Sequence, residues 1–175
     1  VIGEDDKNGT EIYFLPDRSV FQVTVYEFSI LAARLRELAF LNKGIHLSLT
    51  DERNKDDKGD FVSETFFSEN GLSDFIGYLD ENREKLTQEI ISIDGEKNGV
   101  PVEIAMQYNT SFTENLHSYV NNINTIEGGT HLSGFRRGLT RTLKSYADKS
   151  GMLLKLKFDI SGDDFREGLT AVISI

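Results

Sequence analysis

The sequence has no cysteine, which excludes disulfide scaffolds, thiolate metal sites and cysteine nucleophiles. It also has no window approaching the roughly 18 uncharged apolar residues that a membrane-spanning helix needs. The first five residues, Val-Ile-Gly-Glu-Asp, have neither the basic nor the apolar region of a secretory signal peptide. These absences favour a protein of the cytoplasm with no membrane partner.

Positive charge is also scarce. The sequence has 19 Lys and Arg but 29 Asp and Glu, so the net charge of the 175 residues is −10. This balance argues against a protein that coats nucleic acid over its whole surface, although a local basic face remains compatible with it. With 38% hydrophobic residues, the chain can bury a core as one domain or two small ones.

Both ends are expected to be internal to a longer protein. Val1 is not an initiator methionine, and the last eight residues have the pattern of a strand that stops while still apolar. Natural termini usually end in polar residues. Function is therefore sought for a parent protein as well as for this piece.

The hydrophobic patterns predict a mixed α+β fold in two units, residues 1–69 and 70–175. The first unit is expected to contain a strand, a helix, a strand, a charged loop and a strand, at 10–15, 28–40, 45–50, 51–60 and 61–67. The loop assignment for 51–60 follows from its dense charge, which is typical of a solvated segment.

The second unit is expected to be richer in antiparallel strands. Its predicted elements are helices at 72–79 and 132–149 and strands at 89–94, 100–108, 116–123, 152–158 and 168–175. Asn98-Gly99 is a strong hairpin signal between two of these strands. The alternation from Val100 to Tyr108 predicts one apolar strand face, and residues 162–166 predict a short capped turn.

The helix at 132–149 has two chemically distinct faces. At about 100° per residue, the following residues form an apolar band, predicted to pack on the strand at 100–108: Leu132, Phe135, Leu139, Leu143 and Tyr146. Four cations are grouped away from it: Arg136, Arg137, Arg141 and Lys144. In an acidic chain, this stripe fits either a surface that faces DNA phosphates or a solvated helix face with ion partners elsewhere.

Other chemical signals are weaker. Gly128-Gly129-Thr130 before the same helix fits a phosphate-binding turn, but a tight turn that needs glycine explains it more simply. The three histidines lack metal-ligand spacing, and no nucleophile has a base at a recognisable spacing. The residues by themselves therefore indicate a fragment with no metal site and no active site of its own.

Several stretches together carry the pattern of a known family. They are residues 35–44 (LRELAFLNKG), 121–125 (NNINT), 127–131 (EGGTH) followed by GFR at 134–136, and 163–172 (DDFREGLTAV). Their order and spacing resemble the B subunits of type II DNA topoisomerases over nearly the whole chain. The NNI and EGGTH forms resemble the gyrase branch more than the topoisomerase IV branch.

The resemblance implies a specific fold. Residues 1–69 would be the C-terminal part of a GHKL-type ATP-binding domain, and residues 70–175 would be most of a transducer domain. Such a transducer has the fold of ribosomal protein S5 domain 2, with a left-handed βαβ crossover. Most such crossovers are right-handed, so periodicity could not have indicated this one.

The resemblance also implies that the catalytic parts lie elsewhere. The catalytic glutamate and the magnesium-ligating asparagine would precede residue 1, and the transducer lysine would follow residue 175. Only Gly9-Thr10 matches an ATP-site motif, in which the threonine hydroxyl helps to hold the adenine. The fragment alone is therefore expected to be inactive and to have no bound cofactor, although the parent would use ATP and Mg²⁺.

In such enzymes ATP binding closes two B subunits into a clamp, and hydrolysis reorients the transducer so that one DNA duplex passes through another. The implied partners are DNA, the A subunit and a second B subunit, and the implied outcome is supercoiling. The four cations at 136, 137, 141 and 144 would then face DNA. Open alternatives are the topoisomerase IV paralogue, a coupling module without chemistry of its own, and a small-molecule kinase of similar fold, which the lack of a proper phosphate loop disfavours.

Overall fold

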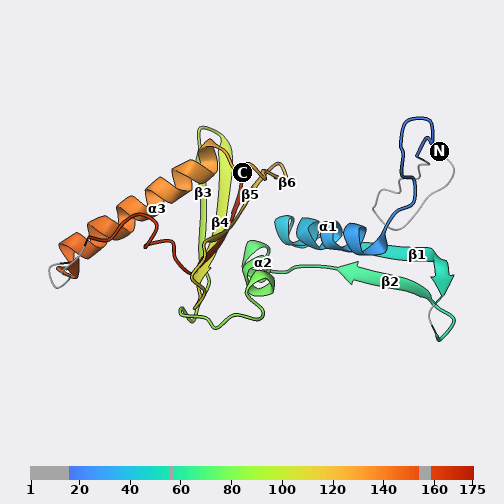
Figure 1. Ribbon diagram of the computed structural model, residues 1–175, viewed down its shortest axis with the longest axis horizontal. Coiled ribbons are helices and arrows are strands. Elements are labelled where there is room, and N and C mark those ends of the chain that lie inside the picture. Colours follow the sequence, from blue (N-terminus) through green and yellow to red (C-terminus); the bar gives the residue numbers. More distant parts are fainter. Residues whose placement is uncertain (1–15, 56, 154–158) are drawn as a thin grey trace.

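The computed structural model describes residues 16–55, 57–153 and 159–175 of the chain. The molecule is elongated, with a helix and a hairpin at one end, a five-stranded sheet near the middle and a long helix projecting from the other end (Figure 1). This mixed α+β architecture confirms the predicted fold class. Among the described residues, no helix has the length and apolarity to cross a membrane.

The first unit packs one helix on one hairpin. Helix α1 covers Phe28–Leu41, and strands β1 (Leu47–Lys55) and β2 (Phe61–Phe66) pair antiparallel. Ala32 and Ala39 lie on the helix face that meets Phe66, and all three are buried. Their small side chains allow the helix to approach the hairpin closely, and the predicted helix at 28–40 is confirmed.

The loop predicted for the charged segment 51–60 is wrong for the first half of that segment. Strand β1 continues through Lys55, with a register shift between Asp51 and Lys55. At this shift Arg53 donates to both oxygens of Asp51, at 2.8 and 2.7 Å. These hydrogen bonds lower the pKa of Asp51 to about 2. Charged residues are compatible with this hairpin because its outer face is open to water.

The second unit is built on a sheet with the strand order β3-β4-β7-β5-β6. The strands cover Ile91–Lys97 (β3), Val100–Tyr108 (β4), Asn115–Val120 (β5), Ile123–Asn124 (β6) and Leu169–Ser174 (β7). All neighbours are antiparallel except β5 and β7, which run parallel. The chain joins these two through helix α3 (Thr130–Lys149), so a βαβ crossover is present; its left-handed sense stays a prediction.

Two turns in this sheet depend on residues that tolerate a left-handed backbone. Asn98 and Gly99 have φ of 55° and 76°, as the predicted β3–β4 hairpin requires. Asn121 and Asn122 also have positive φ, 49° and 63°. The predicted single strand at 116–123 is therefore wrong, because this turn divides it into the β5–β6 hairpin.

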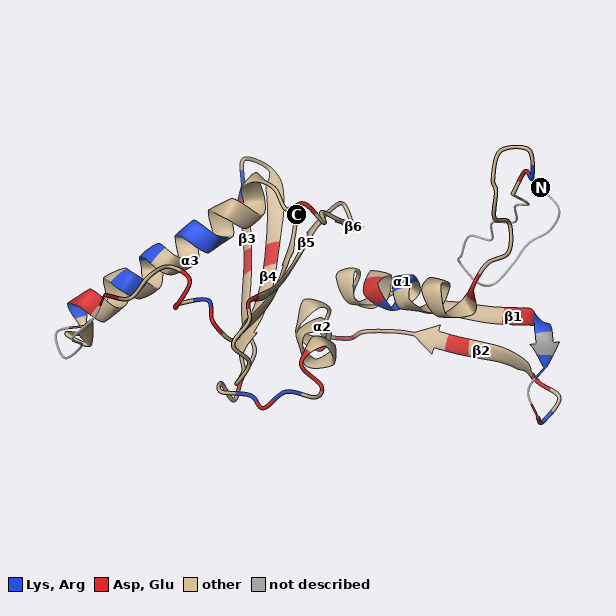
Figure 2. Cartoon of the chain, viewed as in Figure 1, with Lys and Arg blue, Asp and Glu red and all other residues tan. Residues whose placement is uncertain are grey.

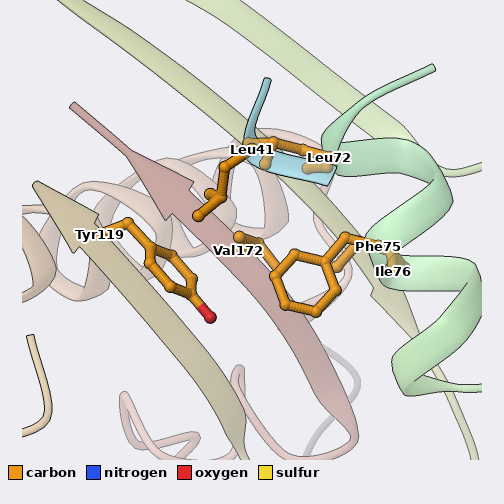
Figure 3. Packing of buried hydrophobic residues seen from close by; sticks show 7 residues of the cluster. Leu41, Leu72, Phe75, Ile76, Tyr119 and Val172 are labelled. Carbon is orange, nitrogen blue, oxygen red and sulfur yellow. The ribbon is translucent and has the colours of Figure 1, made fainter. Parts of the chain in front are cut away.

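One face of the sheet is covered by helix α2 (Leu72–Leu79), at the predicted position. Phe75 and Ile76 pack against Val172 and Tyr119 of the sheet, and Leu41 at the end of α1 completes the cluster (Figure 3). The core of the second unit thus includes a residue of the first. The boundary near residue 70 stays a prediction, since the core continues across it.

Within the described residues, the first half of α3 packs on the opposite face. Leu132 is buried, and Phe135 and Leu139 pack half-buried on a cluster with Met106, Leu169, Ala171 and Ile173. Ile104 and Tyr108 join them, so the predicted face of β4 is confirmed in part. Beyond Leu139 the helix extends away from the sheet (Figure 1), and Tyr146 is 63% exposed.

A buried polar network joins the end of α2 to the sheet. The Asp80 side chain is fully buried, and Oδ1 accepts hydrogen bonds from Thr170 Oγ1 at 2.7 Å and Arg83 Nη1 at 3.1 Å. Its Oδ2 accepts from Asn109 Nδ2 at 2.9 Å. Both carboxylate oxygens are satisfied, as a charge in a protein interior requires.

Some predictions fall partly or wholly outside the described residues. The strand predicted at 10–15 lies outside them, as does most of the strand predicted at 152–158. Residues 162–166 do form the predicted turn, in which Arg166 N–H donates to Asp163 O at 2.9 Å.

Candidate nucleic-acid interface

Helix α3 begins at a glycine turn that its own residues close. Gly128 has φ of 76°, and a Cβ on Gly129 would lie 2.8 Å from the His131 ring. His131 therefore occupies the space beside the helix start, and Thr125 Oγ1 lies 3.3 Å from its Nε2. This geometry favours the tight-turn interpretation of Gly128-Gly129-Thr130 over a phosphate site.

The basic stripe predicted from the helical wheel is present on the projecting part of α3. Arg137, Arg141 and Lys144 are exposed, and none has an ion-pair partner among the described residues. Basic bands recur along the helix, and an acidic band appears only near its C-terminal end, at Asp148 (Figure 2). The helix therefore carries concentrated positive charge on an otherwise acidic chain.

The stripe forms one side of a groove of ≈ 600 Å³. The turn at 161–167 forms the other side, because the Arg166 guanidinium reaches across to α3 and donates to Thr140 Oγ1 at 2.9 Å. The groove is lined by Ser133, Arg136, Arg137, Thr140, Arg141, Lys144, Gly162 and Arg166. Five of these eight residues are cations and none is an acid, so the groove is suited to a polyanion.

Arg136 differs from the other three predicted residues because it has a partner. Its Nε and Nη2 donate to the two oxygens of Glu114, at 3.1 and 2.6 Å. The Arg136 side chain is still 41% exposed, so it is not a buried structural ion pair. The DNA-facing role predicted for the four cations remains a prediction.

Among the residues that line the groove, Arg166 is the cation that sequence reasoning missed. Its local pattern, Gly162-Asp163-Asp164-Phe165-Arg166, predicts only a capped turn. The link from Arg166 to Thr140 spans 26 positions and exists only in the folded molecule. No periodicity could have placed this cation beside the stripe on α3.

A second candidate feature is the junction between α1 and the β5–β6 turn. Arg34 on α1 donates to the Asn122 backbone oxygen at 2.6 Å, and Asn122 Nδ2 donates to Asn42 Oδ1 at 3.0 Å. Asn122 lies in the left-handed β5–β6 turn, eight residues before α3. Helix α1 therefore holds the hairpin that leads into the basic helix.

Titratable side chains lie next to this junction. Burial lowers the pKa of His117 and raises the pKa of Tyr119, and the negative charge of Glu37 on α1 raises both. The Tyr119 hydroxyl is buried without a hydrogen-bond partner in the described part of the chain. Neutral forms of both rings are therefore favoured beside the contact between the units.

The predicted nucleotide contacts, Gly9 and Thr10, lie outside the described residues. Within the described ranges, no group of three or more histidine or carboxylate side chains is arranged to hold a metal ion. The site that this part of the chain presents is thus the basic groove together with the α1–Asn122 junction.

Comparisons with known proteins place the chain in a sequence family. Residues 71–175 match the family model described as DNA gyrase B. The chain is 60% identical to the DNA gyrase B subunit of Cytophaga hutchinsonii over 174 residues and 58% identical to that of Eisenibacter elegans over 175. It spans 36% and 37% of the length of these relatives.

Solved structures agree with the sequence comparison. The 43K ATPase domain of Thermus thermophilus gyrase B, in complex with an aminocoumarin, matches 91% of this chain with a TM-score of 0.76 at 32% identity. The B subunit of DNA gyrase from Myxococcus xanthus gives 0.74 at 26% identity. Each match covers 42% of the other chain. The chain belongs to the DNA gyrase B family.

Proposed function

We propose that the chain is part of an ATP-hydrolysing DNA gyrase, in which residues 70–175 couple the nucleotide state to clamp closure and DNA strand passage. Family membership supports the enzyme class. The role of this region is supported by the groove on α3, whose described lining residues include five cations and no acid. The exposed members are Arg137, Arg141 and Lys144, and Arg136 contributes a partly exposed fourth charge to the same stripe.

A transported duplex needs weak attraction that is independent of sequence, because tight binding would stall its passage. Phosphate contacts from exposed cations provide such attraction, and added salt weakens it. The test is fluorescence anisotropy of a labelled duplex titrated with the chain at several salt concentrations. Salt-sensitive binding supports the proposal, and no binding at low salt contradicts it.

The α1–Asn122 junction is proposed as the coupling contact. Arg34 and Asn42 belong to the unit assigned to nucleotide binding, and the turn that they hold leads into α3. A change in the position of α1 would therefore move the hairpin and the basic helix with it. The parallel β5–β7 pairing carries the same movement into the core of the sheet.

Arg34→Gln is expected to uncouple the longer parent enzyme. The variant loses a charge-assisted hydrogen bond to Asn122 O, worth about 1.5–3 kcal/mol. The number of supercoils introduced per ATP hydrolysed should fall, whereas ATP hydrolysis without DNA should persist. Arg53→Gln is the matched control, because Arg53 bonds Asp51 and Tyr26, which both lie in the first unit. If Arg34→Gln and Arg53→Gln introduced the same number of supercoils per ATP hydrolysed, Arg34 would have no specific role in coupling.

We assign ATP binding and hydrolysis to the longer parent enzyme rather than to this chain alone. Gly9 and Thr10 are the proposed contacts to ATP, with Mg²⁺ held by residues outside this chain. We expect the 175-residue chain alone to release no phosphate from ATP above the buffer background. Steady-state phosphate release in a preparation free of contaminating ATPase measures this, and turnover above background would show that the chain contains its own catalytic groups.

The proposed partners of the parent are DNA, the gyrase A subunit and a second B subunit on ATP binding, in the cytoplasm. The sequence similarity to gyrase B subunits supports this set over that of the topoisomerase IV paralogue. By itself, the chain would act as a coupling and binding module.

A further inference from the structure

We propose that Glu114 acts as a built-in substitute for a DNA phosphate. Its carboxylate occupies a two-arginine site between Arg136 and Arg166, and a phosphodiester group of duplex DNA displaces it when the groove is filled. This inference rests on the proposed function of the groove, and it adds both a further phosphate-binding residue, Arg166, and a means of limiting affinity.

The pairing of Glu114 with Arg136 has the geometry of phosphate recognition. Two guanidinium nitrogens, Nε and Nη2, donate to two oxygens of one anion, at 3.1 and 2.6 Å. Arginine binds carboxylates and phosphates with the same planar fork. An incoming phosphodiester with two free oxygens can therefore replace the carboxylate on Arg136 without any change in donor geometry.

The contact with Arg166 shows that the carboxylate fills the site incompletely. Glu114 Oε1 lies 2.8 Å from Arg166 Nε, so the two form an ion pair. The two atoms nevertheless form no hydrogen bond, and Nε is buried without a hydrogen-bond partner among the described residues. A buried donor without a hydrogen bond is costly. Phosphate oxygens are arranged tetrahedrally, so they can reach donors that a planar carboxylate does not satisfy.

Arg166 is held in position independently of Glu114. Its Nη1 donates to Thr140 Oγ1 at 2.9 Å, its Nη2 pairs with Asp163, and only 14% of its side chain is exposed. The guanidinium would therefore remain in the groove wall after Glu114 had left. Arg136 and Arg166 both line the basic groove, and Glu114 lines a cavity that shares Arg166 with it, so the two-arginine site borders the place proposed for DNA.

The displaced carboxylate has space in a second cavity, which shares Arg166 with the groove. Glu114 lines a neighbouring cavity of ≈ 240 Å³ together with Phe112, Asp163, Asp164, Arg166 and Glu167. The three other acids in this lining repel a carboxylate, so the open state is unfavourable and Glu114 returns when the phosphate leaves. Such exchange of one anion for another keeps DNA binding weak and reversible, as strand passage requires.

The decisive variant is Glu114→Gln, studied in the whole chain by anisotropy with a labelled duplex. Removing the competing charge should tighten binding by roughly fivefold, the scale of one partly exposed ion pair. It should also steepen the salt dependence by about one unit of slope for each arginine released to a phosphate. Glu89→Gln removes the same charge from an exposed position outside the groove and should change neither quantity appreciably.

A double-mutant cycle separates this role from a structural one. The gain in duplex affinity from Glu114→Gln should disappear when Arg136 and Arg166 are both replaced by glutamine, because the substitution then frees no arginine to bind a phosphate. A structural role predicts weaker binding, because a destabilised chain cannot gain affinity. If thermal melting shows that Glu114→Gln unfolds, Glu114→Asp replaces it. Aspartate keeps the charge, but its shorter side chain should weaken the contacts with the two arginines, so binding should tighten by less than about fivefold.

The outcomes distinguish the two proposals. No duplex binding by the wild-type chain would overturn the function proposed for the groove. Wild-type binding with no gain in a folded Glu114 variant would overturn only the role of Glu114. Inorganic phosphate serves as a competitor: if the variant gained affinity for phosphate but not for the duplex, the site would take free anions and the assignment to DNA would be wrong.

Discussion

Replacing Arg137, Arg141 and Lys144 together with glutamine should reduce the affinity of the chain for duplex DNA by on the order of 10²–10³-fold at about 50 mM salt. These three side chains are exposed, and the described residues offer them no ion-pair partner, so each is free to contact a phosphate. Each phosphate contact releases condensed counterions from DNA, and the entropy of that release is largest at low salt.

The same variant should have a shallower salt dependence, by about three units of slope. Anisotropy titrations between about 50 and 200 mM salt measure both quantities. In the parent enzyme, supercoiling should slow while nucleotide affinity stays unchanged. An unchanged slope would show that the stripe is only a solvated helix face, which is the alternative that the helical wheel leaves open.

The matched control replaces Arg18, Lys85 and Lys97 with glutamine. All three are exposed cations away from the groove lining, so the net charge changes by the same amount. If general electrostatic attraction explained the binding, both triple variants would lose affinity equally. A selective loss in the α3 variant would locate the phosphate contacts in the groove.

Elements with a strong local signal could be predicted from sequence. The helices at 28–41 and 72–79 have clear periodicity, and Asn98-Gly99 supplies the backbone that its hairpin needs. The Asn121-Asn122 turn uses the same left-handed geometry without glycine, so its signal is hidden in a β-rich segment. The charged end of β1 escapes prediction because strand pairing with β2, rather than composition, decides its structure.

The candidate site likewise contains some residues that could be predicted from sequence and others that could not. Arg137, Arg141 and Lys144 follow from helical spacing, and the structure places all three in one groove. Glu114 and Arg166 are 22 and 30 positions from Arg136, and only the tertiary fold brings them to it. Sequence reasoning could therefore predict the charge of the surface, whereas it could not predict the anion that competes for it.

Asp80→Ala should destabilise the chain strongly, with a loss of about 3–5 kcal/mol in the free energy of unfolding. The fully buried carboxylate bonds Arg83, Asn109 and Thr170, and it links the end of α2 to the sheet. Its removal leaves the Asn109 amide and the Thr170 hydroxyl each short of one hydrogen-bond partner in the interior, and an unsatisfied buried polar group destabilises the folded state.

Urea unfolding of the chain measures this loss, with Asp80→Asn and Asp148→Ala as comparisons. The amide of Asp80→Asn keeps one acceptor, so this variant should lose less than Asp80→Ala. Asp148 is an exposed carboxylate on α3, and its removal should stay within about 0.5 kcal/mol. Because α2 also packs against Leu41 of α1, Asp80→Ala should loosen the contact between the two units and thereby weaken coupling in the parent. An Asp80→Ala loss below about 1 kcal/mol would show that water or Arg83 compensates the network, and the carboxylate would then not hold α2 on the sheet.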